Sequence, residues 1–246
     1  MIQWRLDHFC DHLASVMPHT LTVDFSRPIR LFPLAQCILL PHATVPLHIF
    51  EQRFRAMTKD ALDADGLIAM ATFDGDDYQV DYEGTPPIRP SVCVGYVVHH
   101  ERLYDGRYNI LLQGIARATI QEECELSPGG YRTAILRPAE TSVMELDLED
   151  QRKCLDELLR DEHLQQLACI RNIRNWFSPD LSTPVVIDLA WQAISRDSEQ
   201  RYAVLAEPCV FKRFESLQHH LLRTRKTLAM AQQMGSCTSE TGLPLN

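Results

Sequence analysis

Histidines are the side chains of this sequence whose spacing comes nearest to a metal site. They form three close pairs: His42 with His48, His99 with His100, and His219 with His220. Neutral imidazole is a common metal ligand, so each pair is a candidate. Adjacent residues, however, point to opposite faces of a strand and diverge by about 100° on a helix. The last two pairs therefore cannot share one ion, and we interpret His48 as a hydrogen-bonded structural histidine.

The cysteines form no close pair that would place two thiolates on one zinc ion. No Cys-x-x-Cys motif occurs, and no secretory signal peptide precedes them. We interpret them as reduced, mostly buried thiols of a cytoplasmic protein, and we expect neither a metal nor another cofactor. Their positions are Cys10, Cys37, Cys93, Cys124, Cys154, Cys169, Cys209 and Cys237.

The sequence motifs of nucleotide binding and of hydrolysis are missing. No Gly is followed directly by Lys, which excludes the phosphate-binding loop G-x-x-x-x-G-K. The motifs G-x-G-x-x-G, H-E-x-x-H and G-x-S-x-G are absent as well. A Ser-Lys dyad needs a lysine of lowered pKa beside a serine, and none of the lysines lies in an apolar segment that carries a serine. The sequence therefore predicts a protein that is not an enzyme.

Composition and charge are those of a soluble globular protein. The chain has 246 residues, 45% of them hydrophobic, and a net charge of −9. Both halves are acidic when the chain is divided near Glu140, which argues against nucleic acid as a partner because phosphate binding needs a basic face. No apolar run approaches the roughly 18 residues of a membrane span, so no membrane association is expected.

Apolar periodicity divides the chain into four segments. Residues 1–28 are predicted to be a helical extension that packs on the body of the protein, with binding to a partner protein as the alternative. Residues 29–140 read as a β-rich subdomain, residues 141–233 as a helical bundle, and residues 234–246 as a disordered tail.

The β-rich segment combines short strands with one helix. Prolines limit the first strands to a few residues each. Phe50, Phe54, Met57 and Ala61 form an apolar stripe at helical spacing, and residues 67–73 have the apolar density of a fully buried strand. The dipeptide Asp105-Gly106 predicts a tight hairpin turn. Together these features predict a small barrel or rolled sheet.

The segment after Glu140 shows helical periodicity only. Thr183 followed by Pro184 predicts the start of one helix, and Ser198 is a candidate cap of the next, which ends at Glu207-Pro208. Val210, Phe214, Leu217, Leu221 and Leu228 form a long apolar stripe on the last helix. The whole chain is therefore expected to have an α+β fold.

Several motifs resemble the Lon N-terminal, or Lon substrate-binding, family. They are the segment LFPL at 31–34, the segment PLHIFE at 46–51 with Arg53, Arg55 and Met57 behind it, the Asp105-Gly106-Arg107 turn, and Gly114 with Arg117. The resemblance covers roughly residues 29–230 and implies a PUA-like β-barrel followed by an all-helical subdomain. In Lon proteases this region precedes an ATPase and a Ser-Lys peptidase domain, so the chain resembles the stand-alone bacterial members of the family.

Eight residues of these motifs are candidates for contact with a peptide or a partner protein. They are Leu34, Pro46, His48, Phe50, Glu51, Arg53, Arg107 and Arg117. A structural interpretation competes with binding: Glu51, Arg53 and Arg117 can form ion pairs that hold the helix to the barrel, and proline fixes a strand end. A cleft between the two subdomains is the expected position of a ligand.

The resemblance implies a non-catalytic module that binds unfolded or tagged polypeptides or a partner protein. An adaptor role in proteolysis or protein quality control, and self-association, are further implications of it. Two alternatives from other classes stay open. One is a small-molecule sensor or unrecognised enzyme, which would need a deep polar pocket, and the other is an RNA-binding PUA-like module, which would need a basic stripe.

Overall fold

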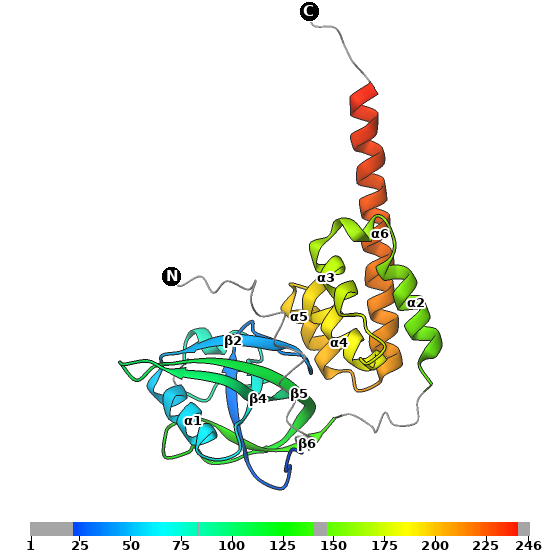
Figure 1. Cartoon of the computed structure of the whole chain (residues 1–246). Helices are drawn as coiled ribbons and strands as arrows, with labels where there is room; N and C mark the ends of the chain where they lie inside the picture. Colours follow the sequence, from blue (N-terminus) through cyan, green and yellow to red (C-terminus); the bar gives the residue numbers. More distant parts are fainter. Residues whose placement is uncertain (1–21, 83, 140–146, 241–246) are drawn as a thin grey trace, which may run out of the picture.

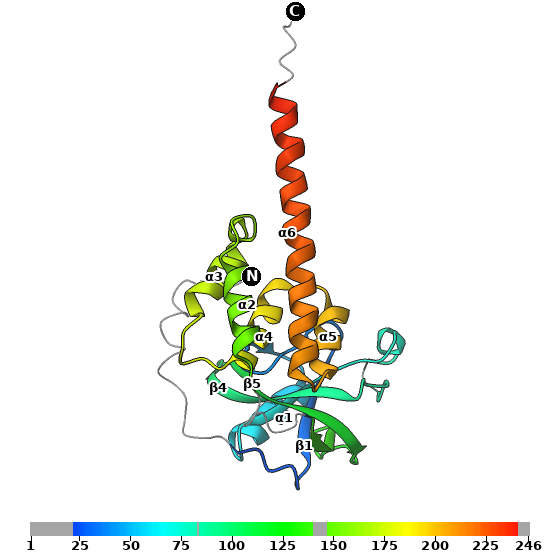
Figure 2. The ribbon, with the colours of Figure 1, turned by 90° about the vertical axis from the view of Figure 1, so that its right-hand side faces the viewer.

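The protein consists of a β-barrel part and a helical part that lie side by side, with the last helix projecting from the second part (Figures 1 and 2). The computed structural model describes residues 22–82, 84–139 and 147–240. Most of the predicted N-terminal helix, up to residue 21, lies outside the described residues. The sheet, together with its helices, confirms the predicted α+β fold.

One six-stranded sheet builds the barrel part, in the order β2-β5-β4-β3-β1-β6. The long strand β5 also pairs with β6, so five strands close into a barrel, while β2 pairs with the other end of β5. β1 runs parallel to β3, and the other pairs are antiparallel. The strands are β1 (Ile29–Leu34), β2 (Thr44–Ile49), β3 (Leu67–Thr72), β4 (Ser91–Arg102), β5 (Tyr108–Glu123) and β6 (Thr133–Pro138).

Strand β3 is buried on both faces, as its continuous apolar sequence predicts. Leu67, Ala69 and Ala71 join a core formed by side chains of the five closed strands. Ile68 and Met70 join a second core, which extends through helix α1 and into the helical part. The two parts of the molecule therefore share one continuous apolar interior.

Helix α1 (Gln52–Leu62) follows β2 and buries Phe54, Met57 and Ala61. The sequence also assigned Phe50 to this apolar stripe, and here the prediction was wrong. The helix begins only after Glu51, its N-cap residue, and the Phe50 side chain is 61% exposed. Phe50 still belongs to the extended chain that leaves β2, so helical spacing does not apply to it.

The helical part carries five α-helices and a short 3₁₀ helix, Leu164–Gln166; a second 3₁₀ helix, Asp77–Gln79, lies in the loop after β3. Ser182 and Asp197 are the residues that cap α4 and α5, one position before the predicted Thr183 and Ser198. Asp197, and not Ser198, is the N-cap residue of α5 because its carboxylate accepts hydrogen bonds from the backbone N–H groups of Glu199 and Gln200. The helices are α2 (Glu149–Leu159), α3 (Ala168–Trp176), α4 (Thr183–Ile194), α5 (Ser198–Ala206) and α6 (Val210–Glu240).

Helix α6 continues to Glu240, whereas composition predicted a disordered tail from Met234. Extending an existing helix adds one hydrogen bond per residue without a new nucleation step, so a polar sequence can follow a stable helix for several residues. Residues 241–246 lie outside the described part. Within the described residues, no helix has both the length and the apolar character needed to cross a membrane.

Candidate functional site

The C-terminal end of strand β2 and the tip of the β4–β5 hairpin lie side by side at the end of the barrel far from the helical part (Figure 1). The register places His48 opposite Asn109 and Ile49 opposite Tyr108. The predicted turn is present: Gly106 has φ +81°, a conformation that favours glycine. We call the group of side chains at this end the hairpin surface, and it consists of Pro46, His48, Phe50, Tyr104 and Arg107.

A hydrogen-bonded chain of polar side chains crosses three strands beside this surface. Asn109 donates from Nδ2 to Glu101, 3.0 Å away, so its Oδ1 is the acceptor in the 2.7 Å contact with His48 Nδ1. This network assigns the His48 proton to Nδ1 and leaves Nε2 to accept from Arg107 Nη1 at 3.2 Å. The chain holds both the imidazole and the guanidinium in fixed positions on an exposed face.

Asp105 binds the other side of the Arg107 guanidinium: Arg107 Nε donates to Asp105 Oδ2 at 2.6 Å. The backbone N–H of Arg107 donates to the same carboxyl group and lowers the pKa of Asp105 below its usual value. Asp105 therefore stays ionised and restrains the arginine side chain at the turn.

Two aromatic side chains of the hairpin surface are open to solvent. Phe50 is 61% exposed and stacks loosely on His48, with ring centroids 6.3 Å apart, and Tyr104 at the hairpin turn is fully exposed. Exposed aromatic rings next to an arginine are the composition that protein interfaces favour, because they bury much apolar area with few rotatable bonds. The arrangement suits recognition and contains no nucleophile paired with a base.

Glu51 and Arg53 do not join this surface. The Glu51 carboxylate accepts from Arg53 Nε at 3.1 Å and from the Tyr82 hydroxyl at 2.9 Å. Arg53 also stacks over the Tyr82 ring and donates to its backbone carbonyl. Burial, followed by the hydrogen bond to Glu51, raises the pKa of Tyr82, which keeps the hydroxyl a donor. These contacts fasten the loop after β3 to helix α1.

Arg117 lies in the interior, between the barrel and the helical part. Its two terminal nitrogens donate to both carboxylate oxygens of Asp188 on α4, each at 2.7 Å, and both side chains are at most 1% exposed. Arg213 Nε lies 3.3 Å from the same carboxylate. This buried cluster joins β5 to α4 and α6.

The structure thus brings Pro46, His48, Phe50 and Arg107 together and separates the other four candidates. Leu34 ends β1, half-buried against the larger core. Sequence reasoning missed Tyr104, Asn109, Glu101, Asp188 and Arg213. Only Asp188 gave a signal, as the one charged residue in the apolar helix sequence TPVVIDLAWQAI.

Several polar contacts cross the boundary between the two parts, where the sequence predicted a cleft. Gln192 of α4 accepts from Leu40 N and donates to the Ile38 carbonyl, and the Tyr202 hydroxyl accepts from Ser91 N. Arg89 stacks on the Tyr202 ring and pairs with Glu199. These contacts hold the two parts together, and the cleft stays a prediction.

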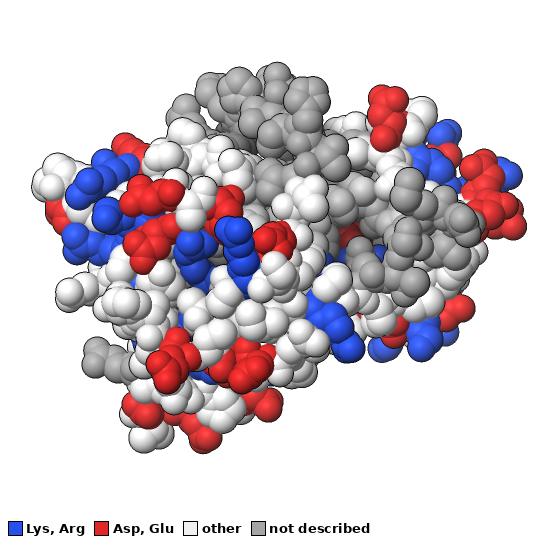
Figure 3. All heavy atoms as spheres, turned by 90° about the horizontal axis from the view of Figure 1, so that it is seen from below, with Lys and Arg blue, Asp and Glu red and all other residues white. Residues whose placement is uncertain are grey.

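Metal binding and nucleic-acid binding gain no support from the described residues. Within residues 22–82, 84–139 and 147–240, no three His, Cys, Asp or Glu side chains lie close enough to hold a metal ion. On the face shown in Figure 3, basic and acidic side chains are interspersed and form no continuous basic stripe. The hairpin surface remains the candidate site.

Comparison with known proteins identifies the family. The model of the ATP-dependent protease La (LON) substrate-binding domain matches residues 28–223. The chain belongs to this family. The match comprises the substrate-binding domain and no catalytic domain.

Among curated proteins, the Lon protease of Geobacter metallireducens is 27% identical to this LON-family chain, and the aligned region covers 86% of this chain. Lon protease 2 of Bdellovibrio bacteriovorus is 21% identical, and the aligned region covers 60% of this chain. The matched regions are only 26% and 18% of those two proteins. This chain therefore spans about a quarter or less of the length of these relatives.

Two solved structures share the fold. The N-terminal domain of the Mycobacterium avium complex Lon protease superposes with a TM-score of 0.61 at 17% identity, covering 79% of this chain and 98% of that one. A Lon N-terminal domain protein from Xanthomonas campestris gives a TM-score of 0.56 at 20% identity, covering 78% and 96%. At these identities the likeness establishes the fold alone.

Proposed function

We propose that this chain is a non-catalytic module that binds polypeptides through the hairpin surface. The observation that carries the proposal is the exposed Phe50 ring next to an arginine and a histidine that are held in place by hydrogen bonds. Membership of a family of substrate-binding domains supports it. The clients are unfolded or tagged polypeptides, and the module passes them on as an adaptor in proteolysis.

The chemistry of the surface specifies what it binds. Phe50 and Tyr104 offer apolar contact, and Arg107 offers a positive charge beside them. A peptide with an apolar side chain next to an acidic one would satisfy both, since a guanidinium donates well to a carboxylate. We therefore assign this pattern to the client.

The proline in β2 favours recognition through side chains over strand addition. β2 ends the strand order of the sheet, which is where an added peptide strand would pair. Pro46 has no N–H group to donate and is exposed on this short strand. Edge strands with proline resist pairing with another chain, so the client is expected to lie across the exposed aromatic rings.

Binding of fluorescein-labelled, permanently unfolded casein, followed by fluorescence anisotropy, tests the proposal. We expect saturable binding at micromolar concentrations, weakened about tenfold or more by Phe50→Ala, because truncation of an aromatic anchor costs on the order of 2 kcal/mol. Leu126→Ala is the matched control, since Leu126 is 54% exposed and lies outside the hairpin surface.

Circular dichroism of each variant establishes that it is folded. Absence of saturable binding by the unaltered chain, or equal losses in Phe50→Ala and Leu126→Ala, would refute the assignment to this surface. An intermediate loss in Arg107→Gln is also expected, because that change removes the charge and leaves the aromatic rings in place.

A further inference from the structure

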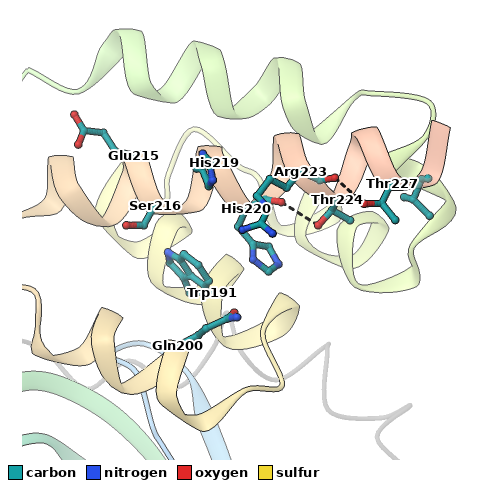
Figure 4. A pocket seen from close by; sticks show the side chains of 10 residues that line it. Trp191, Gln200, Glu215, Ser216, His219, His220, Arg223, Thr224 and Thr227 are labelled. Carbon is teal, nitrogen blue, oxygen red and sulfur yellow. Dashed lines mark hydrogen bonds between the residues drawn. The ribbon is translucent and has the colours of Figure 1, made fainter. Parts of the chain in front are cut away.

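A cavity of about 790 Å³, open to solvent, lies at the surface of the helical part between α4, α5 and α6 (Figure 4). Its volume lies in the range of small-molecule sites. It is far from the hairpin surface, which lies at the other end of the molecule (Figure 1). Polypeptide binding at the hairpin surface does not use this cavity.

An immobilised aromatic side chain forms one wall. Trp191 of α4 is 4% exposed, and its indole N–H donates to the Arg213 carbonyl at 3.2 Å, which fixes the ring. The His220 ring of α6 lies beside it, with centroids 5.3 Å apart (Figure 4). Because Trp191 is almost fully buried, the half-buried His220 ring is the aromatic surface that this wall offers to a planar ligand.

Hydrogen-bond donors face the same space. Gln200 of α5 accepts from the Ser195 hydroxyl through Oε1, which leaves its Nε2 group to donate. The guanidinium of Arg223 lies in the lining as well, one turn beyond the Trp191–His220 pair. The guanidinium of Arg223 and the amide of Gln200 both donate well to an anionic group on a ligand.

Arg223 places a positive charge one helical turn from His220. Burial lowers the pKa of His220, and electrostatic interaction with Arg223 and His219 lowers it further. The acidic residue of the lining, Glu215, precedes Arg223 by eight positions, which is about 12 Å along a helix. The end of the cavity near Arg223 is therefore positive, and the acidic end is distant.

We propose that the cavity binds a small organic anion with a planar ring. The ring lies against His220, in front of the buried Trp191, and the anionic group, a carboxylate or its equivalent, lies toward Arg223 and Gln200. The site is independent of the proposed function, and neither depends on the other.

Isothermal titration calorimetry with 2-naphthoate tests the proposal on the full chain. Two probes of the same ring serve as comparisons: the neutral 2-naphthamide and the cationic 2-naphthylmethylamine. We expect submillimolar binding of the naphthoate, and binding at least tenfold weaker of both other probes. Arg223→Gln should weaken naphthoate binding about tenfold, since a charge-assisted hydrogen bond contributes about that factor.

Lys226→Gln is the matched control, because it removes the same charge from an exposed position of α6 outside the cavity. It should leave naphthoate binding within twofold. Three results would each overturn the proposal: no saturable binding of naphthoate up to 5 mM, equal or tighter binding of the amide or the amine, or equal effects of Arg223→Gln and Lys226→Gln. Loss of casein binding has no bearing on this result.

Discussion

The buried cluster of Arg117, Asp188 and Arg213 predicts an unusual ranking of variants. Two guanidinium groups share a single carboxylate, and all three side chains are 1% exposed or less. Asp188→Asn is nearly isosteric but removes the negative charge that both guanidinium groups contact. Arg117→Met removes one positive charge and leaves Asp188 paired with Arg213.

The cost of Asp188→Asn follows from these contacts. Removing one partner of a buried ion pair costs about 3–5 kcal/mol, because the other charge stays buried without compensation. Asp188→Asn takes away a carboxylate that both arginines contact, so we expect a loss of about that size. Since whole domains have stabilities of about 5–15 kcal/mol, the variant should lose a large fraction of its free energy of unfolding.

Arg117→Met should cost clearly less than Asp188→Asn. The methionine retains most of the apolar volume, and Asp188 keeps its contact with Arg213. Urea denaturation followed by circular dichroism measures both free energies, and urea is preferred because it does not screen charges as guanidinium chloride does.

A matched control uses an exposed ion pair of similar chemistry. Glu199→Gln breaks the pair with Arg89, in which the glutamate side chain is 75% exposed, and should cost about 1 kcal/mol or less. If Arg117→Met destabilised the protein more than Asp188→Asn, or if Asp188→Asn cost no more than Glu199→Gln, the charge argument would be refuted.

Three smaller perturbations follow from other contacts. Gly106→Ala should lower the thermal midpoint by about 2–4 °C in calorimetry, because φ +81° costs a residue with a Cβ about 1 kcal/mol; an unchanged midpoint would contradict this. Asp197→Ala removes the α5 cap and should lower the free energy of unfolding, measured in urea, by about 1 kcal/mol. Asp197→Asn keeps an acceptor at the cap and should keep most of that free energy. Burial, together with Arg223 and His219, holds the pKa of His220 in the fold below its unfolded value of about 6.5, so the fold binds fewer protons. The free energy of unfolding should therefore fall as the pH drops below about 6.5. In thermal melts recorded between pH 5 and 8, His220→Gln should flatten that decline. Equal pH dependence of the melting temperature in both proteins would rule out His220 as its cause.

Local chemistry determined much of the barrel. Glycine after aspartate is one of the few pairs that adopt a tight hairpin turn, so the turn at Asp105-Gly106 could be predicted without knowledge of any partner strand. The continuous apolar run of β3 required burial on both faces, which the two cores provide. The motif residues that marked the family resemblance also lie within the matched region.

Tertiary contacts determined which residues form the candidate site and which residues connect the two parts. Phe50 fits an apolar helical stripe by spacing, and only the position of the helix start after Glu51 leaves it exposed. Arg117 meets Asp188, which is 71 positions away in the sequence, so periodicity within one element cannot reveal the pair. The cavity beside Trp191 depends on three separate helices. Sequence patterns report which face of an element is apolar, because that is a local property of spacing. Which charge meets which, and which apolar face stays uncovered, depend on how distant elements pack.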